Sequence, residues 1–223
     1  MMTTNKLTKT FASGSLAIGV LAGAVLTATS ANAAMLSWEQ WTTFDPITQT
    51  YPNALIEGDK KVTYVGGGIG AEALDDVALT KMGDHYYFTY DSLTQGAPDP
   101  NKGIGGTFTY TIEVTKPGWH IIGVDLDSDV SSNYGTVTET FAEIPGLSLV
   151  STNGSQDPDS GFIGIDPIKK LTVTNTLTDP MSPDEGLFQF QNSFHQSVPE
   201  PGTILGLLAV GGLGLVSRFK KQK

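Results

Sequence analysis

The 223-residue sequence contains no cysteine, and it has few basic residues, 13 against 23 acidic ones. Without cysteine the chain has no disulfide framework, no thiolate nucleophile and no cysteine-ligated zinc site. A formal net charge of -10 argues against nucleic-acid binding, because that function needs a basic surface to meet the phosphates. Long apolar runs occur only at the two ends, so the polar middle is expected to be the folded body.

The N-terminal end predicts an export signal. Lys6 and Lys9 precede an apolar run that ends in Ala31-Asn32-Ala33. A basic flank, an apolar core and a small-x-small site are the three parts of a secretory signal peptide. We expect residues 1–33 to form a signal-peptide helix, with Ala31 and Ala33 marking the cleavage site and the Sec machinery as the export route. A transmembrane anchor or a buried core helix is the alternative, but glycines and serines interrupt the run.

The C-terminal end combines a short proline motif, an apolar run and a basic tail. The motif is Val198-Pro199-Glu200-Pro201, and the apolar run covers 204–216; the basic residues of the tail are Arg218, Lys220, Lys221 and Lys223. A helix over residues 202–219 would reach about 27 Å against a bilayer core of about 30 Å. The flanking cations favour a cytoplasmic C-terminus. Residues 198–223 are therefore expected to form a single transmembrane helix, a transient inner-membrane anchor, with residues 34–197 facing outward.

This order of motif, apolar helix and basic tail resembles the PEP-CTERM sorting signal of bacterial surface proteins, with Pro199, Glu200 and Pro201 as its signature. The resemblance implies recognition by an exosortase, a membrane-embedded transpeptidase-like protease, and transfer of the body to the cell surface or extracellular matrix. The same tail is also called an ice-binding protein C-terminal domain, a label for the sorting segment that is no evidence of ice binding. An uncleaved anchor with a proline-kinked entrance is the alternative.

The section between the two ends is predicted to be one acidic domain. Residues 34–197 contain seven lysines, no arginine and 22 acidic residues, which gives a charge of -15. Such a surface is soluble, repels acidic polymers and attracts divalent cations. The 164 residues are enough for a single core that buries roughly 70% of the surface of the unfolded chain.

Alternation of apolar and polar residues predicts that this domain is all-β. In 107–115 the apolar residues alternate with threonines, so one face enters a core and the other meets water. The other predicted strands are 61–65, 77–81, 85–91, 119–126, 133–141, 170–178 and 187–194. Strands at this spacing predict an antiparallel β-sandwich or a jelly-roll-like domain. Segments 56–64 and 124–130 are similar to secreted β-rich domains that precede PEP-CTERM tails in cyanobacteria, which implies a fold class and no activity.

Asp125, Asp127 and Asp129 form a D-x-D-x-D pattern that suggests a calcium site. An EF-hand is excluded, because Val130 and Thr136 stand where its loop requires glycine and glutamate. In a straight strand the three carboxylates would project about 6.6 to 6.8 Å apart, too far to share one ion. Calcium would need the chain to curl or another loop to contribute, and a solvated strand end is the alternative. The sequence predicts no other cofactor.

The remaining motifs favour a protein that is not an enzyme. There is no G-x-S-x-G elbow, and His85, His120 and His195 stand far apart without metal-ligand spacing. Three tryptophans are candidates for stacking on sugar rings or for filling the core, namely Trp38, Trp41 and Trp119. Alternating threonines in 107–111 and 172–178 could present hydroxyls to a glycan or to ice, although threonine is also a common residue on the wet face of a strand.

The expected function is therefore that of an exported, exosortase-processed protein with a non-catalytic structural or adhesive role at the cell surface or in the extracellular matrix. A carbohydrate-binding module, with or without calcium, is the alternative. A secreted polysaccharide-active enzyme is the third hypothesis. The expected partners are the exosortase, the Sec machinery and extracellular polysaccharide, and nucleic acid is not among them.

Overall fold

The computed structural model describes residues 33–92, 105–130, 134–178 and 186–197. Within these ranges the chain forms twelve strands and one helix of five residues. No helix among the described residues is long and apolar enough to cross a membrane. The predicted signal-peptide helix with Ala31, the predicted transmembrane helix and its flanking Arg218, Lys220, Lys221 and Lys223 lie outside the described residues.

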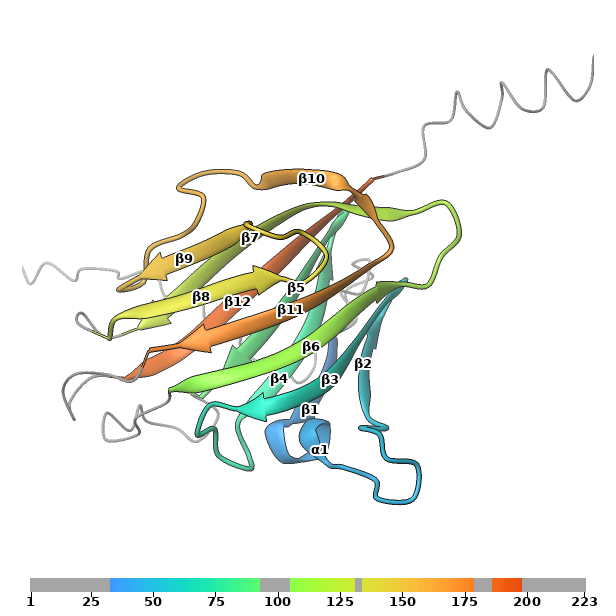
Figure 1. The fold of residues 1–223 in the computed structure, drawn as a ribbon, viewed down its shortest axis with the longest axis vertical. Helices are drawn as coiled ribbons and strands as arrows, with labels where there is room; N and C mark the ends of the chain where they lie inside the picture. The colour runs from blue at the N-terminus through green and yellow to red at the C-terminus, as the bar shows by residue number, and fades with distance from the viewer. Residues whose placement is uncertain (1–32, 93–104, 131–133, 179–185, 198–223) are drawn as a thin grey trace, which may run out of the picture. The chain divides into compact units, whose positions relative to one another are not determined.

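The strands form two six-stranded antiparallel sheets (Figure 1). The first sheet contains, in spatial order, β1 (Ala33–Ser37), β4 (Asp76–Met82), β5 (His85–Asp91), β12 (Leu187–Ser197), β7 (His120–Val130) and β10 (Ile163–Ile168). The second contains β2 (Ala54–Glu57), β3 (Lys60–Gly68), β6 (Gly106–Val114), β11 (Lys170–Leu177), β8 (Thr136–Phe141) and β9 (Ser148–Thr152). The last strand of the chain, β12, therefore lies inside its sheet, between β5 and β7.

The two sheets pack face to face, which confirms the predicted β-sandwich. Along β6, Phe108, Tyr110 and Ile112 are fully buried, while the threonines between them point to the opposite face. The same alternation in β5 supplies facing side chains from the first sheet, and in β11 it continues the inner face of the second sheet beside β6. Period-two burial on both sheets is the pattern that packs two antiparallel sheets around one core.

The helix α1 (Trp38–Thr42) closes one end of the core with aromatic rings. A capping box starts it, in which Ser37 and Gln40 each bind the backbone of the other. Its two tryptophans point inward, with Trp41 fully buried, and their rings make edge contacts with those of the strands, such as Trp38 with Phe108 at 5.4 Å. Such a cluster contributes strongly to stability because aromatic side chains bury large areas.

A polar layer lies inside the sandwich. The Tyr110 hydroxyl donates to Asn192 Oδ1 at 2.9 Å, and Asn175 and Asn192 exchange two hydrogen bonds of 3.1 Å. Glu139 of β8 is fully buried near them, and within the described residues no well-formed hydrogen bond reaches either of its carboxyl oxygens. Burial raises the pKa of Glu139 well above its usual range, although the Asn192 amide opposes the shift.

The sequence predicted the central strands best. The strand predicted at 85–91 has these bounds, and that at 107–115 is shifted by one residue. The structure adds four strands that were not predicted, β1, β2, β9 and β10, and begins β8 at Thr136 instead of residue 133. It also extends β7 to Val130 and β12 to Ser197. The missed strands have at most six residues and lie at or next to the sheet edges, where patterning is weakest.

Candidate functional site

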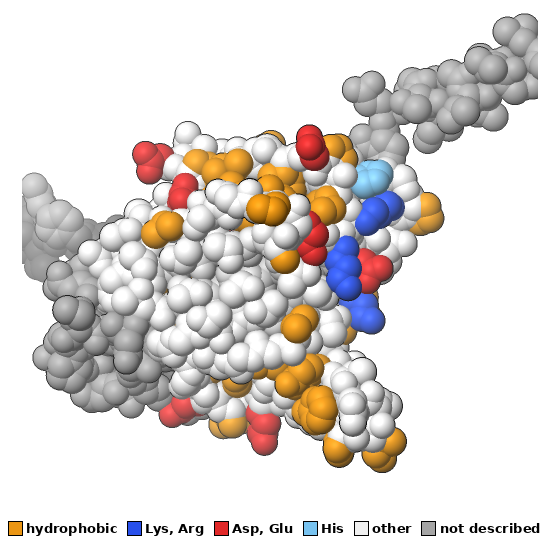
Figure 2. Space-filling view, in the orientation of Figure 1, with side chains coloured by type: hydrophobic (Ala, Val, Ile, Leu, Met, Phe, Trp, Pro, Cys, Tyr) orange, Lys and Arg blue, Asp and Glu red, His pale blue; other side chains and the backbone are white. Residues whose placement is uncertain are grey.

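The described lysines lie together at one end of the sandwich, which we call the lysine end. It consists of the β2–β3 turn, the β4–β5 turn, the β6–β7 connection, the β10–β11 junction and the end of β12. Its six lysines are Lys60, Lys61, Lys81, Lys116, Lys169 and Lys170. They are all the lysines in the described part of the chain, and Figure 2 shows blue side chains grouped at that edge.

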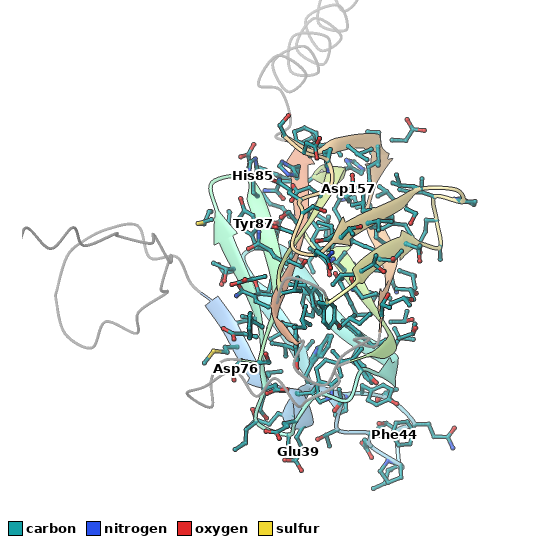
Figure 3. All side chains as sticks on the ribbon, turned by 90° about the vertical axis from the view of Figure 1, so that its left-hand side faces the viewer. Glu39, Phe44, Asp76, His85, Tyr87 and Asp157 are labelled. Atoms are coloured by element: carbon teal, nitrogen blue, oxygen red, sulfur yellow. The ribbon has the colours of Figure 1, made fainter. Side chains whose placement is uncertain are left out.

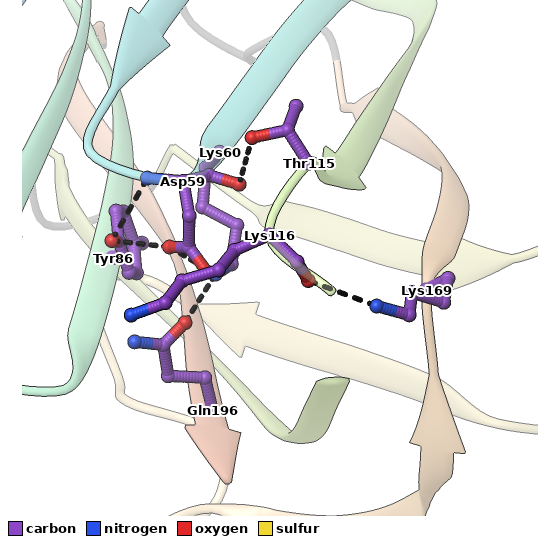
Figure 4. A network of polar contacts seen from close by, with 7 residues as sticks. All are labelled: Asp59, Lys60, Tyr86, Thr115, Lys116, Lys169 and Gln196. Atoms are coloured by element: carbon purple, nitrogen blue, oxygen red, sulfur yellow. Dashed lines mark hydrogen bonds and ion pairs between the residues drawn. The ribbon is translucent and has the colours of Figure 1, made fainter. Parts of the chain in front are cut away.

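A buried ion pair ties β12 into the lysine end (Figure 4). Lys60 is fully buried, and its Nζ donates to Asp59 Oδ1 at 2.9 Å and to the side-chain oxygen of Gln196 in β12. The Tyr86 hydroxyl donates to the same Asp59 oxygen at 2.5 Å. Gly58 permits this approach, because its φ is 56° and a Cβ there would lie 2.6 Å from the Tyr86 hydroxyl.

The electrostatics of this pair follow from burial and contact. Burial opposes ionisation of Asp59, but the hydrogen bonds from Lys60 and Tyr86 outweigh it and hold its pKa below the usual range. Burial lowers the pKa of Lys60, and Asp59 counteracts that shift. Burial, reinforced by Asp59, raises the pKa of Tyr86. The pKa of each of these three groups therefore depends on the other members of the group.

Beside this pair the lysine end is hollowed. The hollow has a volume of about 230 Å³ and is lined by Gly58, Asp59, Lys81, Tyr86, Lys116, Trp119 and Gln196. Lys116 Nζ lies 4.1 Å from the centre of the Trp119 ring, and Lys81 Nζ lies 5.5 Å from that of Tyr86. Of the three tryptophans, only Trp119 is partly exposed, since Trp38 and Trp41 belong to the core. Stacking of sugars on Trp38 or Trp41 is therefore inconsistent with this fold.

A second polar group lies on the outer face of the first sheet. His195 Nε2 and Asp125 Oδ2 are 2.7 Å apart, and the His195 ring lies between those of His85, at 4.0 Å, and Phe162, at 4.1 Å. Figure 3 shows His85 and Tyr87 on this face. His195 and Asp125 are each 7% exposed. No sequence pattern indicates this pair, because its members lie on different strands, 70 positions apart.

The three predicted calcium ligands fall on one face of β7, as the alternation requires. Asp125 is engaged by His195, whereas Asp127 and Asp129 are exposed beside a small hollow of about 80 Å³. Although Asp127 is exposed as a residue, partial desolvation of its carboxyl and then the charges of Asp125 and Asp129 raise its pKa, against a hydrogen bond from the Ser128 backbone. Among the described residues, no three histidine or acidic side chains converge closely enough to hold a metal ion. Calcium binding at Asp125, Asp127 and Asp129 stays a prediction.

The outer face of the second sheet carries a regular array, which we call the threonine face. It is formed by Thr107, Thr109 and Thr111 of β6, Thr172, Thr174 and Thr176 of β11, and Thr136, Thr138 and Thr140 of β8. The register aligns them in rows, one through Thr109, Thr174 and Thr140 and the next through Thr107, Thr176 and Thr138. Hydroxyls along a row touch, at 3.0 Å between Thr109 and Thr174. Figure 2 views this face, whose centre shows no charged side chain.

Comparison with known proteins concerns the C-terminal end. No curated protein matches the chain significantly. Residues 197–221 match the family model of the PEP-CTERM protein-sorting motif, a range that contains the predicted Val198, Pro199, Glu200 and Pro201. The match begins at the last residue of β12, Ser197, so the motif follows the sandwich without a linker. The chain therefore carries the PEP-CTERM sorting motif, the recognition signal for exosortase processing, which implies export to the cell envelope or surface.

Proposed function

We propose that the protein is exported, processed by an exosortase and retained at the cell surface or in the extracellular matrix, where it has a non-catalytic structural or adhesive role. In this proposal residues 1–33 are removed as a signal peptide after Sec export. Residues 198–223 anchor the chain in the inner membrane, with the C-terminus cytoplasmic, until the exosortase acts. Residues 34–197 are the part delivered.

The observation that carries the proposal is the junction between the sandwich and the sorting motif. Ser197 is paired with His120 in the first sheet and is also the first residue of the motif. A sorting signal joined directly to a strand inside the sheet can deliver the sandwich only as one folded unit. A rigid body without a linker suits a structural or adhesive surface protein.

Loss of the exosortase tests the sorting part of this proposal. In a host strain that lacks the enzyme, we expect the protein to keep its C-terminal segment, to gain the mass of up to 26 residues (198–223) and to stay in the inner membrane, because the anchor is not released. Mass spectrometry and fractionation measure both effects.

A Pro199→Ala, Glu200→Ala double variant in the wild-type host should behave in the same way. A Lys61→Gln variant is the matched control and should be processed normally. Unchanged mass and location in the deletion strain would contradict the proposal.

The threonine face supports the adhesive role. Its central rows carry no charged side chain, and the carboxylates of Glu113 and Glu143 lie only at its margin, beside Thr111 and Thr172. On a body of charge -15, an acidic or neutral polymer therefore meets less repulsion at these rows than elsewhere. Rows of hydroxyls and methyls at strand spacing, about 4.8 Å apart, offer both hydrogen bonds and apolar contacts to the faces of sugar rings. The proposed partner is extracellular polysaccharide of the host.

Charge placed on this face tests its role. We expect Thr140→Glu with Thr176→Glu to reduce retention on isolated host polysaccharide by at least about tenfold, since both side chains are exposed and the carboxylates would interrupt the uncharged rows and repel an acidic polymer. Thr80→Glu with Thr89→Glu, on the outer face of the other sheet, is the matched control. Equal retention of the two variants would exclude the threonine face as the adhesive surface.

A carbohydrate-binding module is the second candidate function, and Trp119 is the observation that favours it. Its ring is partly exposed and lines the 230 Å³ hollow together with Lys81 and Lys116. Discrete sugars would bind there, whereas a bulk matrix would adhere along the threonine face. A glycan array with and without calcium separates the two candidates, since a module gives discrete hits that Trp119→Ala abolishes. Dependence of those hits on calcium would also test Asp125, Asp127 and Asp129.

A further inference from the structure

We propose that the lysine end is a membrane-docking surface, which holds the sandwich against the anionic phospholipid headgroups of the leaflet in which the chain is anchored. This inference rests on the proposed anchoring by residues 198–223. It adds an orientation, in which one end of the sandwich faces the lipid and the other faces away.

Charge is strongly divided between the two ends. The lysine end holds six lysines against four carboxylates, those of Glu57, Asp59, Asp84 and Glu113. The other fourteen carboxylates of the described residues lie outside the lysine end, where the described residues include no lysine or arginine. Two of these carboxylates lie at the border: Glu143, which accepts hydrogen bonds from Thr172 near Lys170, and Asp166, which is two residues before the end of β10. An anionic leaflet would therefore attract the lysine end and repel the rest of the domain.

The chain leaves the sandwich at this same end. Ser197 pairs with His120, and Gln196 binds Lys60, so the last described residues of β12 belong to the lysine end. Only residues 198–203 separate Ser197 from the apolar run that starts at Ile204. Six residues span at most about 20 Å even when fully extended. The headgroup region occupies roughly 5 to 7 Å on each side of the bilayer core, so the lysine end is held within reach of it.

The side chains at the lysine end suit a headgroup layer. Lys81 and Lys116 lie over the rings of Tyr86 and Trp119 and line an open hollow. Lysines with long apolar stems and a neighbouring tryptophan are typical of membrane interfaces, where the ring meets the acyl boundary and the ammonium group meets phosphate. Met82, which is 58% exposed at the end of β4, adds apolar surface. Lys60 takes no part, because Asp59 neutralises it inside the fold.

The absence of cysteine allows a direct test with single labels on the full chain, reconstituted into lipid nanodiscs. A fluorophore at Thr115→Cys reports on the lysine end, and one at Thr152→Cys reports on the other end of the second sheet. Quenching by lipids with a nitroxide headgroup measures proximity to the leaflet. In phosphatidylcholine discs containing phosphatidylglycerol, we expect quenching of the first label to exceed that of the second at least about threefold. The excess should fall in pure phosphatidylcholine and with salt, because screening weakens charge attraction.

Two charge-matched variants isolate the lysines. Lys81→Gln with Lys116→Gln should weaken docking about 25-fold, since each lysine near an anionic surface contributes about fivefold. Thr43→Glu with Gln156→Glu changes the net charge by the same amount on exposed positions outside the lysine end and should leave the preference intact.

A chain that does not incorporate into the discs at all would refute the anchor, and with it the proposed sorting topology. A chain that incorporates but quenches both labels equally would overturn the docking surface alone. Release from quenching by inorganic phosphate at constant ionic strength would assign the lysines to a soluble anion and would also overturn it.

Discussion

Replacing Asp59 with asparagine is expected to lower the free energy of unfolding by about 3 kcal/mol. The change keeps the shape of the side chain but leaves the Lys60 ammonium, which is fully buried, without its counter-charge. The Tyr86 hydroxyl loses a charged acceptor at the same time. Chemical unfolding followed by tryptophan fluorescence measures the loss, and thermal unfolding should show a fall in Tm of about 10 °C.

A second substitution separates the ion pair from local packing. In the Asp59→Asn, Lys60→Met double variant the buried charge is gone, so most of the lost stability should return. Lys61→Met serves as the matched control, because Lys61 is the exposed neighbour in the same strand and should change stability by less than about 0.5 kcal/mol. If Asp59→Asn alone were as stable as the wild type, the buried ion pair would not hold this end of the fold together.

Replacing Glu139 with glutamine is expected to stabilise the protein at neutral pH by about 1 to 3 kcal/mol. Burial raises the pKa of Glu139 in the folded state above its ordinary value of 4.5, so the folded state binds this proton more tightly than the unfolded state does. Stability of the wild type must therefore fall as the pH rises from about 4.5 towards the folded pKa. Glutamine has no proton to lose and avoids that cost.

The pH profile makes this prediction specific. Below pH 4 the two proteins should unfold with nearly equal free energies, and the advantage of Glu139→Gln should open as the pH rises through 5 and 6. Glu113→Gln, an exposed carboxylate on β6, is the control and should show no such divergence. Parallel wild-type and Glu139→Gln profiles across pH 4 to 8 would contradict the assignment of a protonated carboxyl to the core.

The sequence predicted those parts of the fold in which a strand carries its own signal. The strand 107–115 alternates over its whole length, so propensity and pattern agree and its position was found. β10 was not predicted, because Gly164 and Pro167 are residues of low strand propensity. Its pairing with β7 is also irregular between Gly164 and Ile168. The helix α1 was not predicted because it has only five residues. Its capping box, Ser37 and Gln40, is nevertheless present in the sequence and could have indicated the helix start.

The candidate surfaces also differ in whether the sequence could predict them. The sorting motif is contiguous, so it could be recognised from the sequence, and the family match over residues 197–221 confirms the motif. The lysine end could not be predicted, because its six lysines come from turns and strand ends scattered from residue 60 to residue 170, and only the topology collects them. The threonines were seen as two separate alternating runs, and the register between β6, β11 and β8 was needed to make a surface of them.

The central position of β12 also governs when the protein can fold. In the Sec export that we propose, the chain emerges from the membrane with its N-terminal part first, so β5 and β7 reach the outside long before β12 does. Until Leu187–Ser197 has followed, the first sheet is split into two parts and its inner face lacks Phe190 and Phe194. Completion of the sheet therefore coincides with arrival of the sorting motif at the membrane. Folding is in this way timed to the end of translocation, and a chain that stalls earlier exposes apolar strands to envelope proteases.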